Sequence, residues 1–298
     1  MLGAAALLLI AIAAVSSLGY KTGKVAFPFF ELYLFQRAKV DAAGEMHTVF
    51  VGDSSLGNAI DARMWAVRTG EPALNLALTG AFGYGGSLNM IRRALAHGGL
   101  RRVVVMQTPD MLTRGISYRG YLLTSDRLFP LGAVPLSVMV DTYLSLDTAL
   151  SVVTKMYSRS APPAVDPIRD YIEQSRPLSA RPAFVRRYRA LRLDTAAIVP
   201  GGLHYLHQIA ALCRAEKLDC VYAHGPILDV YCASSSDYFK AANALIESTG
   251  LRVVAGTPVC MPLAEAGDSE DHVRPDLRAG YTKEYLDLIN DFAAARSR

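Results

Sequence analysis

A serine follows an apolar run near the start of the chain. The segment Val49-Phe50-Val51-Gly52-Asp53-Ser54-Ser55-Leu56 passes from apolar residues into Gly-Asp-Ser, and a helix-compatible segment follows. This pattern predicts a buried strand, a tight turn and a helix, with Ser54 at the turn. A serine in that place lies at the carboxyl edge of a sheet, where open α/β folds bind ligands. The start of the following helix offers free N–H groups that can stabilise an oxyanion.

A histidine preceded by acidic residues near the end of the chain supplies the other parts of a nucleophilic site. The segment is Asp268-Ser269-Glu270-Asp271-His272-Val273. A serine nucleophile needs a general base, and the base needs an orienting carboxylate. Adjacent residues on an extended segment point to opposite sides, so Asp268 is the preferred acid and Asp271 the alternative. The non-catalytic alternatives are a helix-capping turn at Asp53 and an exposed loop histidine.

The elements that must position these residues are predicted from the hydrophobic pattern. From residue 47 onward, apolar runs alternate with segments of helical periodicity. The expected strands are 47–52, 73–78, 101–107, 219–223 and 251–255. The expected helices are 58–69, 87–97, 203–216, 235–248 and 280–295, and 256–278 is expected to be a long loop. This alternation predicts an α/β fold in which a parallel sheet has helices on both faces.

Composition limits the class of protein further. The chain has 298 residues, of which 51% are hydrophobic and 19% charged, so it can bury a large core. A net charge of +4 is too small to indicate nucleic-acid binding. The spacing of the cysteines fits no zinc motif, and we expect neither a metal nor a cofactor.

The chain divides into an apolar N-terminal segment, a connector and one large domain. Residues 1–20 carry no charge and predict a transmembrane anchor or signal segment, with a buried helix as the alternative. Residues 21–45 are expected to be a connector. Residues 46–298 are expected to form the α/β domain, with an irregular insertion at about 110–200. Lys21 and Lys24 follow the apolar segment, and the positive-inside rule alone would place the domain in the cytoplasm.

The Gly-Asp-Ser block, Gly80 after the second expected strand and His272 before the last helix resemble the SGNH/GDSL hydrolase superfamily. The resemblance runs from about residue 47 to the end, apart from the insertion. It implies a three-layer, flavodoxin-like sheet and a catalytic triad of Ser54, His272 and Asp268. It also implies an oxyanion hole formed by the N–H groups of Ser54 and Gly80.

Two positions depart from the family pattern. The third block of the family is Gly-x-Asn-Asp, whereas this chain has Gln107-Thr108-Pro109-Asp110 and so lacks the asparagine of the oxyanion hole. Gln107 or Thr108 could donate in its place. The residue three before the histidine is Ser269 rather than an aspartate. Both departures favour, as an alternative, an inactive scaffold that binds polysaccharide or a membrane partner.

A narrower resemblance is to membrane-anchored proteins related to the alginate O-acetyltransferases. It is carried by the apolar N-terminus, Asn58 to Asp61 after the Gly-Asp-Ser block, and the Asp-His-Val ending. This likeness implies acetyl transfer to or from an exopolysaccharide or envelope glycan. It also implies a periplasmic domain on the bacterial inner membrane and a membrane-bound O-acyltransferase as partner. A simple carbohydrate or lipid esterase with the same triad is the alternative.

Three further features leave alternatives open. Of the four cysteines, Cys232 and Cys260 fall in loops on the side of the nucleophile and are expected to pair first, unless all four are simply buried. His224 ends a strand and either lines the pocket or is structural. The arginines between residues 176 and 192 either bind an anionic polysaccharide or lipid headgroup, or form a solvated helix face.

Overall fold

A five-stranded parallel sheet forms the centre of the molecule. The computed structural model describes residues 2–22, 30–127, 130–145, 149–150, 152–154, 174 and 176–296. The sheet has the order β2-β1-β3-β4-β6, which is the flavodoxin-like order of an open, doubly wound fold. Its strands are β1 (Thr48–Gly52), β2 (Ala73–Ala77), β3 (Arg102–Gln107), β4 (Asp219–His224) and β6 (Arg252–Val253). The predicted parallel α/β sheet is therefore confirmed.

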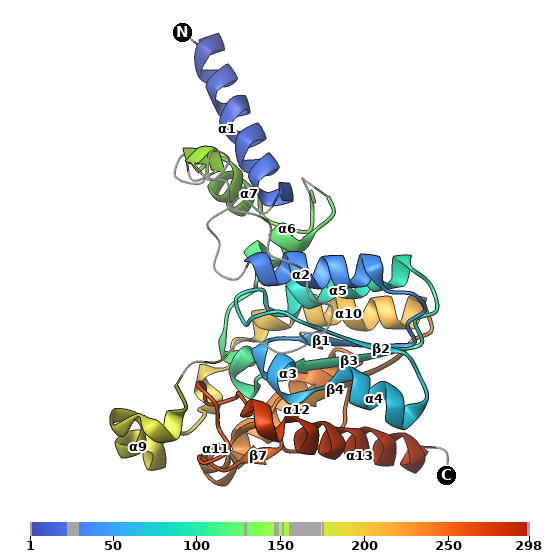
Figure 1. Cartoon of the computed structure of the whole chain (residues 1–298). Coiled ribbons are helices and arrows are strands. Elements are labelled where there is room, and N and C mark those ends of the chain that lie inside the picture. Colours follow the sequence, from blue (N-terminus) through green and yellow to red (C-terminus); the bar gives the residue numbers. More distant parts are fainter. Residues whose placement is uncertain are drawn as a thin grey trace.

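Helices cover both faces of the sheet (Figure 1). One face is covered by α2 (Phe30–Ala42), α5 (Gly83–Ala96), α10 (His204–Ala215) and α12 (Ser236–Ser248). The other face is covered by α3 (Ser54–Ala59), α4 (Ala62–Thr69) and α13 (Arg278–Arg296). Alternate residues of β1 enter the two cores: Val49 and Val51 enter one, and Phe50 enters the other. Both faces of the strand are buried, which explains its continuous apolar run.

The helix expected over 58–69 is two helices, and this changes the position of the serine. Asp61 caps α4, because its Oδ1 accepts hydrogen bonds from the N–H groups of Arg63 and Met64 at 3.0 and 3.2 Å. Ile60 is extended and ends α3. The first helix therefore begins four residues earlier than predicted, and Ser54 is its first residue. Similarly, α5 begins at Gly83 rather than at residue 87, and β6 has only two residues.

The N-terminal region differs from the expected anchor and connector. α1 (Leu2–Thr22) projects away from the body of the molecule (Figure 1). Among the described residues, no helix has the length and apolar character needed to span a bilayer. The transmembrane part of the prediction therefore has no support from the structure. Helix α2, in the expected connector, belongs to the fold: Lys39 Nζ donates to the carbonyl of Asn75 at 2.6 Å and Gln36 Nε2 to that of Ala77 at 2.7 Å.

Short helices make up the described parts of the insertion. They are η1 (Pro109–Thr113), α6 (Tyr118–Thr124), α7 (Leu136–Tyr143), η2 (Leu178–Ala180), α9 (Pro182–Arg187), η3 (Tyr188–Ala190), η4 (Thr195–Ala197) and η5 (Pro200–Leu203). Residues 155–173, at the centre of the expected insertion, lie outside the described residues. The irregular character predicted for this region agrees with these short elements.

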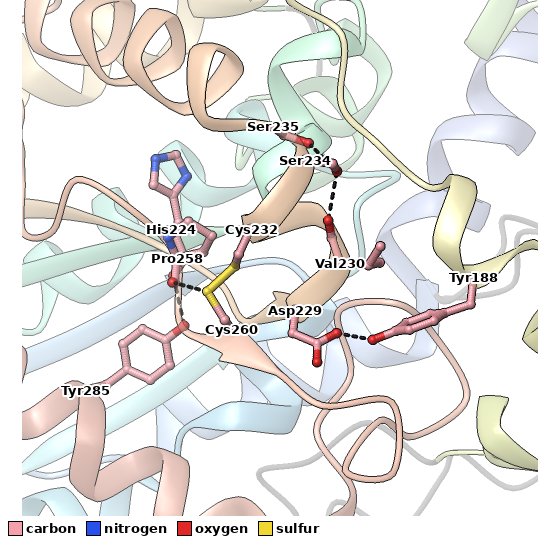
Figure 2. Close-up of a disulfide and its surroundings, with 10 residues drawn as sticks. All are labelled: Tyr188, His224, Asp229, Val230, Cys232, Ser234, Ser235, Pro258, Cys260 and Tyr285. Carbon is pink, nitrogen blue, oxygen red and sulfur yellow. Dashed lines mark hydrogen bonds between the residues drawn. A yellow bond between two sulfur atoms is a disulfide. The ribbon is translucent and has the colours of Figure 1, made fainter.

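A small second sheet lies beside α13 and carries a disulfide. It pairs β5 (Ile227–Leu228) with β7 (Cys260–Met261), a strand within the expected long loop. Cys232, on α11 (Asp229–Ser234), forms a disulfide with Cys260 on β7 (Figure 2). The predicted pairing is therefore confirmed. Cys213 and Cys220 form a second disulfide between the end of α10 and β4.

Candidate active site

The predicted nucleophile lies at the topological switch point of the sheet. From β1 the chain proceeds to β2 on one side, and then returns past β1 to β3 on the other. Ligands of open α/β sheets bind in the crevice outside the carboxyl ends of two such strands. Asp53 and Ser54 follow β1, Gly80 follows β2 and Thr108 follows β3. The fold therefore gathers residues from three separate parts of the sequence at one edge.

Asp53 organises the turn that carries the serine. Its Oδ1 accepts hydrogen bonds from the N–H of Ser55 at 3.0 Å and from the Ser55 hydroxyl at 2.6 Å. Its Oδ2 accepts from the N–H of Thr108 at 2.9 Å and so joins the ends of β1 and β3. Burial, with a further contribution from the negative charge of Asp271, raises the pKa of Asp53 to about 6, although these hydrogen bonds oppose the shift. Asp53 thus holds together the turn that precedes Ser54.

Ser54 is half-buried and stands at the first position of α3. The N–H groups at the start of a helix have no partner within the helix. That of Ser55 donates to Asp53, and among the described residues that of Ser54 donates to no group. The carbonyl of Ser54 accepts a hydrogen bond from Asn58 Nδ2 at 2.9 Å. Within the described part of the chain, the Ser54 hydroxyl forms no hydrogen bond of its own. It is therefore free to approach a substrate.

His272 is paired with Asp268. Its Nδ1 lies 2.7 Å from Oδ1 of Asp268, and both side chains are largely buried, with 13% and 18% exposed. Asp271 is placed differently, because its Oδ1 lies 3.8 Å from Nε2 of His272 and accepts from the hydroxyl of Ser269 at 2.6 Å. With Nδ1 donating to Asp268, Nε2 carries the lone pair that a general base needs.

The charges around His272 favour its protonated form. Burial lowers the pKa of His272, but the hydrogen bond from Nδ1 to Asp268 and the charges of Asp271, Asp268 and Asp53 raise it above the usual value. The charge of Asp53 therefore acts on His272, and that of Asp271 acts on Asp53. An imidazole in this field is suited to accept a proton from a nucleophile and to carry the resulting charge.

The serine and the histidine do not touch in this conformation. Among the described residues, no hydrogen bond joins Ser54 and His272. The structure thus brings Asp268 and His272 together, and Ser54 lies on a helix that Gln174 links to the residue after His272. Hydrogen bonds between a nucleophile and its base are often long in a site without ligand and tighten only when substrate binds.

Gln174 links the two halves of the site and was missed by sequence reasoning. Its Nε2 donates to Oδ1 of Asn58 at 2.9 Å and to the carbonyl of Val273 at 2.6 Å. Asn58 in turn bonds the carbonyl of Ser54, so one chain of hydrogen bonds joins the serine helix to the residue after His272. A Cβ on Gly267 would lie 1.9 Å from Oε1 of Gln174, so the glycine makes room for this contact. No local pattern could have indicated a glutamine from the insertion.

The residues predicted to form an oxyanion hole differ in their surroundings. Gly80 follows β2, and its N–H donates to no group within the described residues. Gln107 does not fit the predicted role, because it is fully buried and its Nε2 donates to the hydroxyl of Ser87 at 3.1 Å. Thr108 is 3% exposed and gives its N–H to Asp53. The N–H of Thr108 and the amide of Gln107 are therefore already used within the fold.

His224 has a structural position. It is 3% exposed, and its Nε2 lies 2.7 Å from Oδ1 of Asn243. Its carbonyl accepts a hydrogen bond from the hydroxyl of Tyr285 at 2.9 Å (Figure 2). Burial lowers its pKa, so it is neutral at physiological pH. These contacts support a structural role for His224 rather than a place in the lining of the pocket.

A cavity of about 440 Å³ adjoins the loop of His272. Asp268, Ser269 and Glu270 line one side, and residues of η2 and α9 line the other: Leu178, Arg181, Ala183, Phe184 and Arg187. Arg187 lies over the ring of Phe184 and pairs with Glu270 at 3.5 Å. Part of the arginine-rich segment is thus engaged in contacts within the protein. The volume is within the range of small-ligand pockets.

No metal centre accompanies these groups: the described ranges hold no cluster of three or more His, Cys, Asp or Glu side chains suited to bind an ion. Comparisons of the chain with models of protein families, with curated proteins and with solved structures found no match. The fold and the site geometry are therefore the basis on which function is inferred.

Proposed function

We propose that this protein is a serine-dependent acyltransferase of the SGNH type, which transfers acetyl groups to or from a cell-envelope or exopolysaccharide glycan. The observation that carries the proposal is the 2.7 Å contact between Nδ1 of His272 and Asp268. It leaves Nε2 as a base on a loop that Gln174 joins to the helix of Ser54. A nucleophile, a base and an orienting acid at one sheet edge are the parts that acyl transfer requires.

The reaction follows from these roles. The hydroxyl oxygen of Ser54 bonds to the carbonyl carbon of the acyl donor, its proton passes to Nε2 of His272, and the π electrons move onto the carbonyl oxygen. The N–H groups of Ser54 and Gly80 stabilise this oxyanion. The C=O bond then reforms and the donor alcohol leaves with the proton from His272. An acceptor hydroxyl then gives its proton to Nε2 of His272 while its oxygen attacks the acyl carbon. The bond between this carbon and the Ser54 oxygen breaks, and His272 returns the proton to the serine.

The acceptor and the location belong to the same proposal. The cavity beside Asp268 presents carboxylate and guanidinium groups, which suit the hydroxyl groups of a sugar unit. Two disulfides are compatible with an extracytoplasmic domain. Leu7, Leu8 and Ile10 of α1 are 69%, 61% and 65% exposed, which supports attachment of this helix to the bacterial inner membrane. A membrane-bound O-acyltransferase would supply the acyl group on the periplasmic side.

Turnover of p-nitrophenyl acetate by the purified protein tests the proposal. We expect release of p-nitrophenolate in the wild type, and a loss of at least about 100-fold in both Ser54→Ala and His272→Ala. Equal activity in the wild type and Ser54→Ala would refute the role of Ser54 as the nucleophile. The addition of glycan oligosaccharides then separates the two forms of the reaction, since acetylated sugar indicates a transferase and acetate alone indicates a carbohydrate or lipid esterase.

A catalytically inactive scaffold is the second candidate. It is favoured by the missing hydrogen bond between Ser54 and His272 and by the proline at the position of the family asparagine. A scaffold would bind polysaccharide with unchanged affinity after Ser54→Ala, and its wild type would show no turnover. An acyltransferase would form an acetyl-serine that intact-mass spectrometry detects in the wild type alone.

A further inference from the structure

Arg114 lies against Gly80, whose N–H belongs to the proposed oxyanion hole. Arg114 comes directly after η1, which begins two residues after the end of β3. The asparagine of the SGNH family pattern belongs to this same segment. A Cβ on Gly80 would lie 2.2 Å from Nη1 of Arg114, so the guanidinium lies against the backbone of Gly80. Because Gly80 has no side chain, the arginine can approach the N–H that the proposed oxyanion hole uses.

The guanidinium is held in place but keeps free donors. Nη2 of Arg114 donates to both carboxylate oxygens of Asp110, at 3.1 and 2.9 Å. Within the described residues, Nη1 donates to no group, although it is the nitrogen nearest Gly80. The Asp110 pair is exposed and four residues apart, and such pairs add little to stability. The pair serves to fix the direction of the arginine.

The charges of the site also favour a cation here. Burial lowers the pKa of Arg114, but the charge and hydrogen bond of Asp110, with the charges of Asp53 and Asp271, raise it overall. Arg114 therefore lies within electrostatic range of the turn beside Ser54 and of the loop beside His272. A positive charge preorganised at such a place stabilises negative charge that develops on a substrate.

We propose that Arg114 is a catalytic residue that donates a hydrogen bond to the oxyanion formed on the acyl donor, in place of the missing asparagine. This inference rests on the proposed acyl transfer. A neutral ester gains negative charge on its carbonyl oxygen only as Ser54 attacks. The arginine therefore stabilises the transition state more than the bound ester, and its loss lowers kcat with little change in KM.

The test compares Arg114→Gln, Arg114→Lys and Arg114→Ala with Arg214→Gln, an exposed arginine on α10 at the opposite end of the sheet. We expect kcat for p-nitrophenyl acetate to fall about 10²–10³-fold in Gln and Ala, with KM within about threefold of the wild type. Arg114→Lys keeps the charge but not the geometry of the guanidinium, so its kcat should lie between that of the wild type and those of the Gln and Ala variants. Arg214→Gln should match the wild type, and the melting temperatures of all four should agree.

A second reagent separates this inference from the proposed function. A fluorophosphonate forms a covalent bond to an activated serine with loss of fluoride, and intact-mass spectrometry measures the rate. Slow labelling of Arg114→Gln beside fast, Ser54-dependent labelling of the wild type supports the inference. Equal kcat and labelling in wild type and Arg114→Gln overturns the role of Arg114 and leaves acyl transfer intact. Absence of any Ser54-dependent reaction in the wild type with either reagent overturns both.

Discussion

Nδ1 of His272 lies 2.7 Å from Oδ1 of Asp268, whereas its Nε2 lies 3.8 Å from Oδ1 of Asp271. The two acids therefore have different relations to the imidazole: Asp268 orients it through a hydrogen bond, and Asp271 acts on it mainly through charge. The structure thus separates two residues that the sequence offered as alternatives for one role.

Replacing the two acids should separate orientation from charge. We expect Asp268→Asn to lower kcat/KM for p-nitrophenyl acetate by about 10²–10⁴-fold, because the amide no longer fixes the reactive tautomer of His272. Asp271→Asn keeps the 2.7 Å contact between His272 and Asp268, so kcat/KM should fall by less than about tenfold. The reverse order of the two losses would assign the orienting role to Asp271.

The pH profile should reveal the electrostatic effect on the base. His272 must be neutral to accept a proton, so kcat/KM rises with pH through its pKa. The hydrogen bond to Asp268 and the charge of Asp271 raise that pKa, so either Asn variant should move the rising limb to lower pH. Initial rates between pH 5 and 9 measure the shift. A limb that moves to higher pH would contradict this account.

Asp53 should make stability depend on pH in a defined window. Its pKa is raised to about 6 in the folded state, above the ordinary value of an unfolded aspartate. The folded state therefore retains a proton that the unfolded state has lost, and stability falls as pH rises from about 4 to about 7. Across this range, the titration of Asp53 lowers the free energy of unfolding by roughly 1–3 kcal/mol.

Urea unfolding of the wild type and of Asp53→Asn across this range tests the effect. The variant lacks the titrating group, so its free energy of unfolding should lose this part of the pH dependence. Parallel pH curves for the two proteins would show that Asp53 does not titrate in this window.

Gln174 should act as a positioning residue. Gln174→Ala leaves Oδ1 of Asn58 and the carbonyl of Val273 without their donor, so we expect a loss of about 1–2 kcal/mol in stability. Because the serine helix and the histidine loop lose their link, kcat should fall about tenfold or more. Gly267→Ala should have the same effect, since its methyl group displaces Gln174.

Gln208→Ala is the matched control, because among the described residues the side chain of Gln208 bonds no group other than the exposed ring of His204. The pH at which kcat/KM is half-maximal adds a readout that a loss of stability alone would not move. If Gln174→Ala unfolds more easily but retains the kcat and pH profile of the wild type, the residue has no positioning role.

The two disulfides should differ in their effect on stability. Cys232 and Cys260 are 28 residues apart, and Cys213 and Cys220 are 7 apart. If a disulfide stabilises by lowering the entropy of the unfolded chain, the one that closes the longer loop adds about 3.5 kcal/mol to the free energy of unfolding and the other about 2.5 kcal/mol. Paired Cys→Ser replacements, compared by thermal unfolding, measure both. A larger loss for Cys213 and Cys220 would show that strain or packing outweighs loop entropy here.

The sequence predicted well those features that depend on local periodicity. The strands ending at Gly52 and Gln107 are predictable because continuous apolar residues mark strands covered on both faces. The alternation of strands and helices then implied a parallel sheet. The boundaries were less accurate where a single side chain decides them, as at Asp61, whose capping bonds begin a second helix.

By itself, then, the sequence determined the order of the strands along the chain, the turn of Ser54, and the acids beside His272. Only the tertiary structure decided that Asp268 is the hydrogen-bonded partner of His272, that Gln107 faces Ser87, and that Gln174 and Arg114 reach the site. Contacts between residues far apart in the chain depend on how the helices and the insertion pack against the sheet. Each such contact is set by the whole fold, and no local pattern of residue types records it.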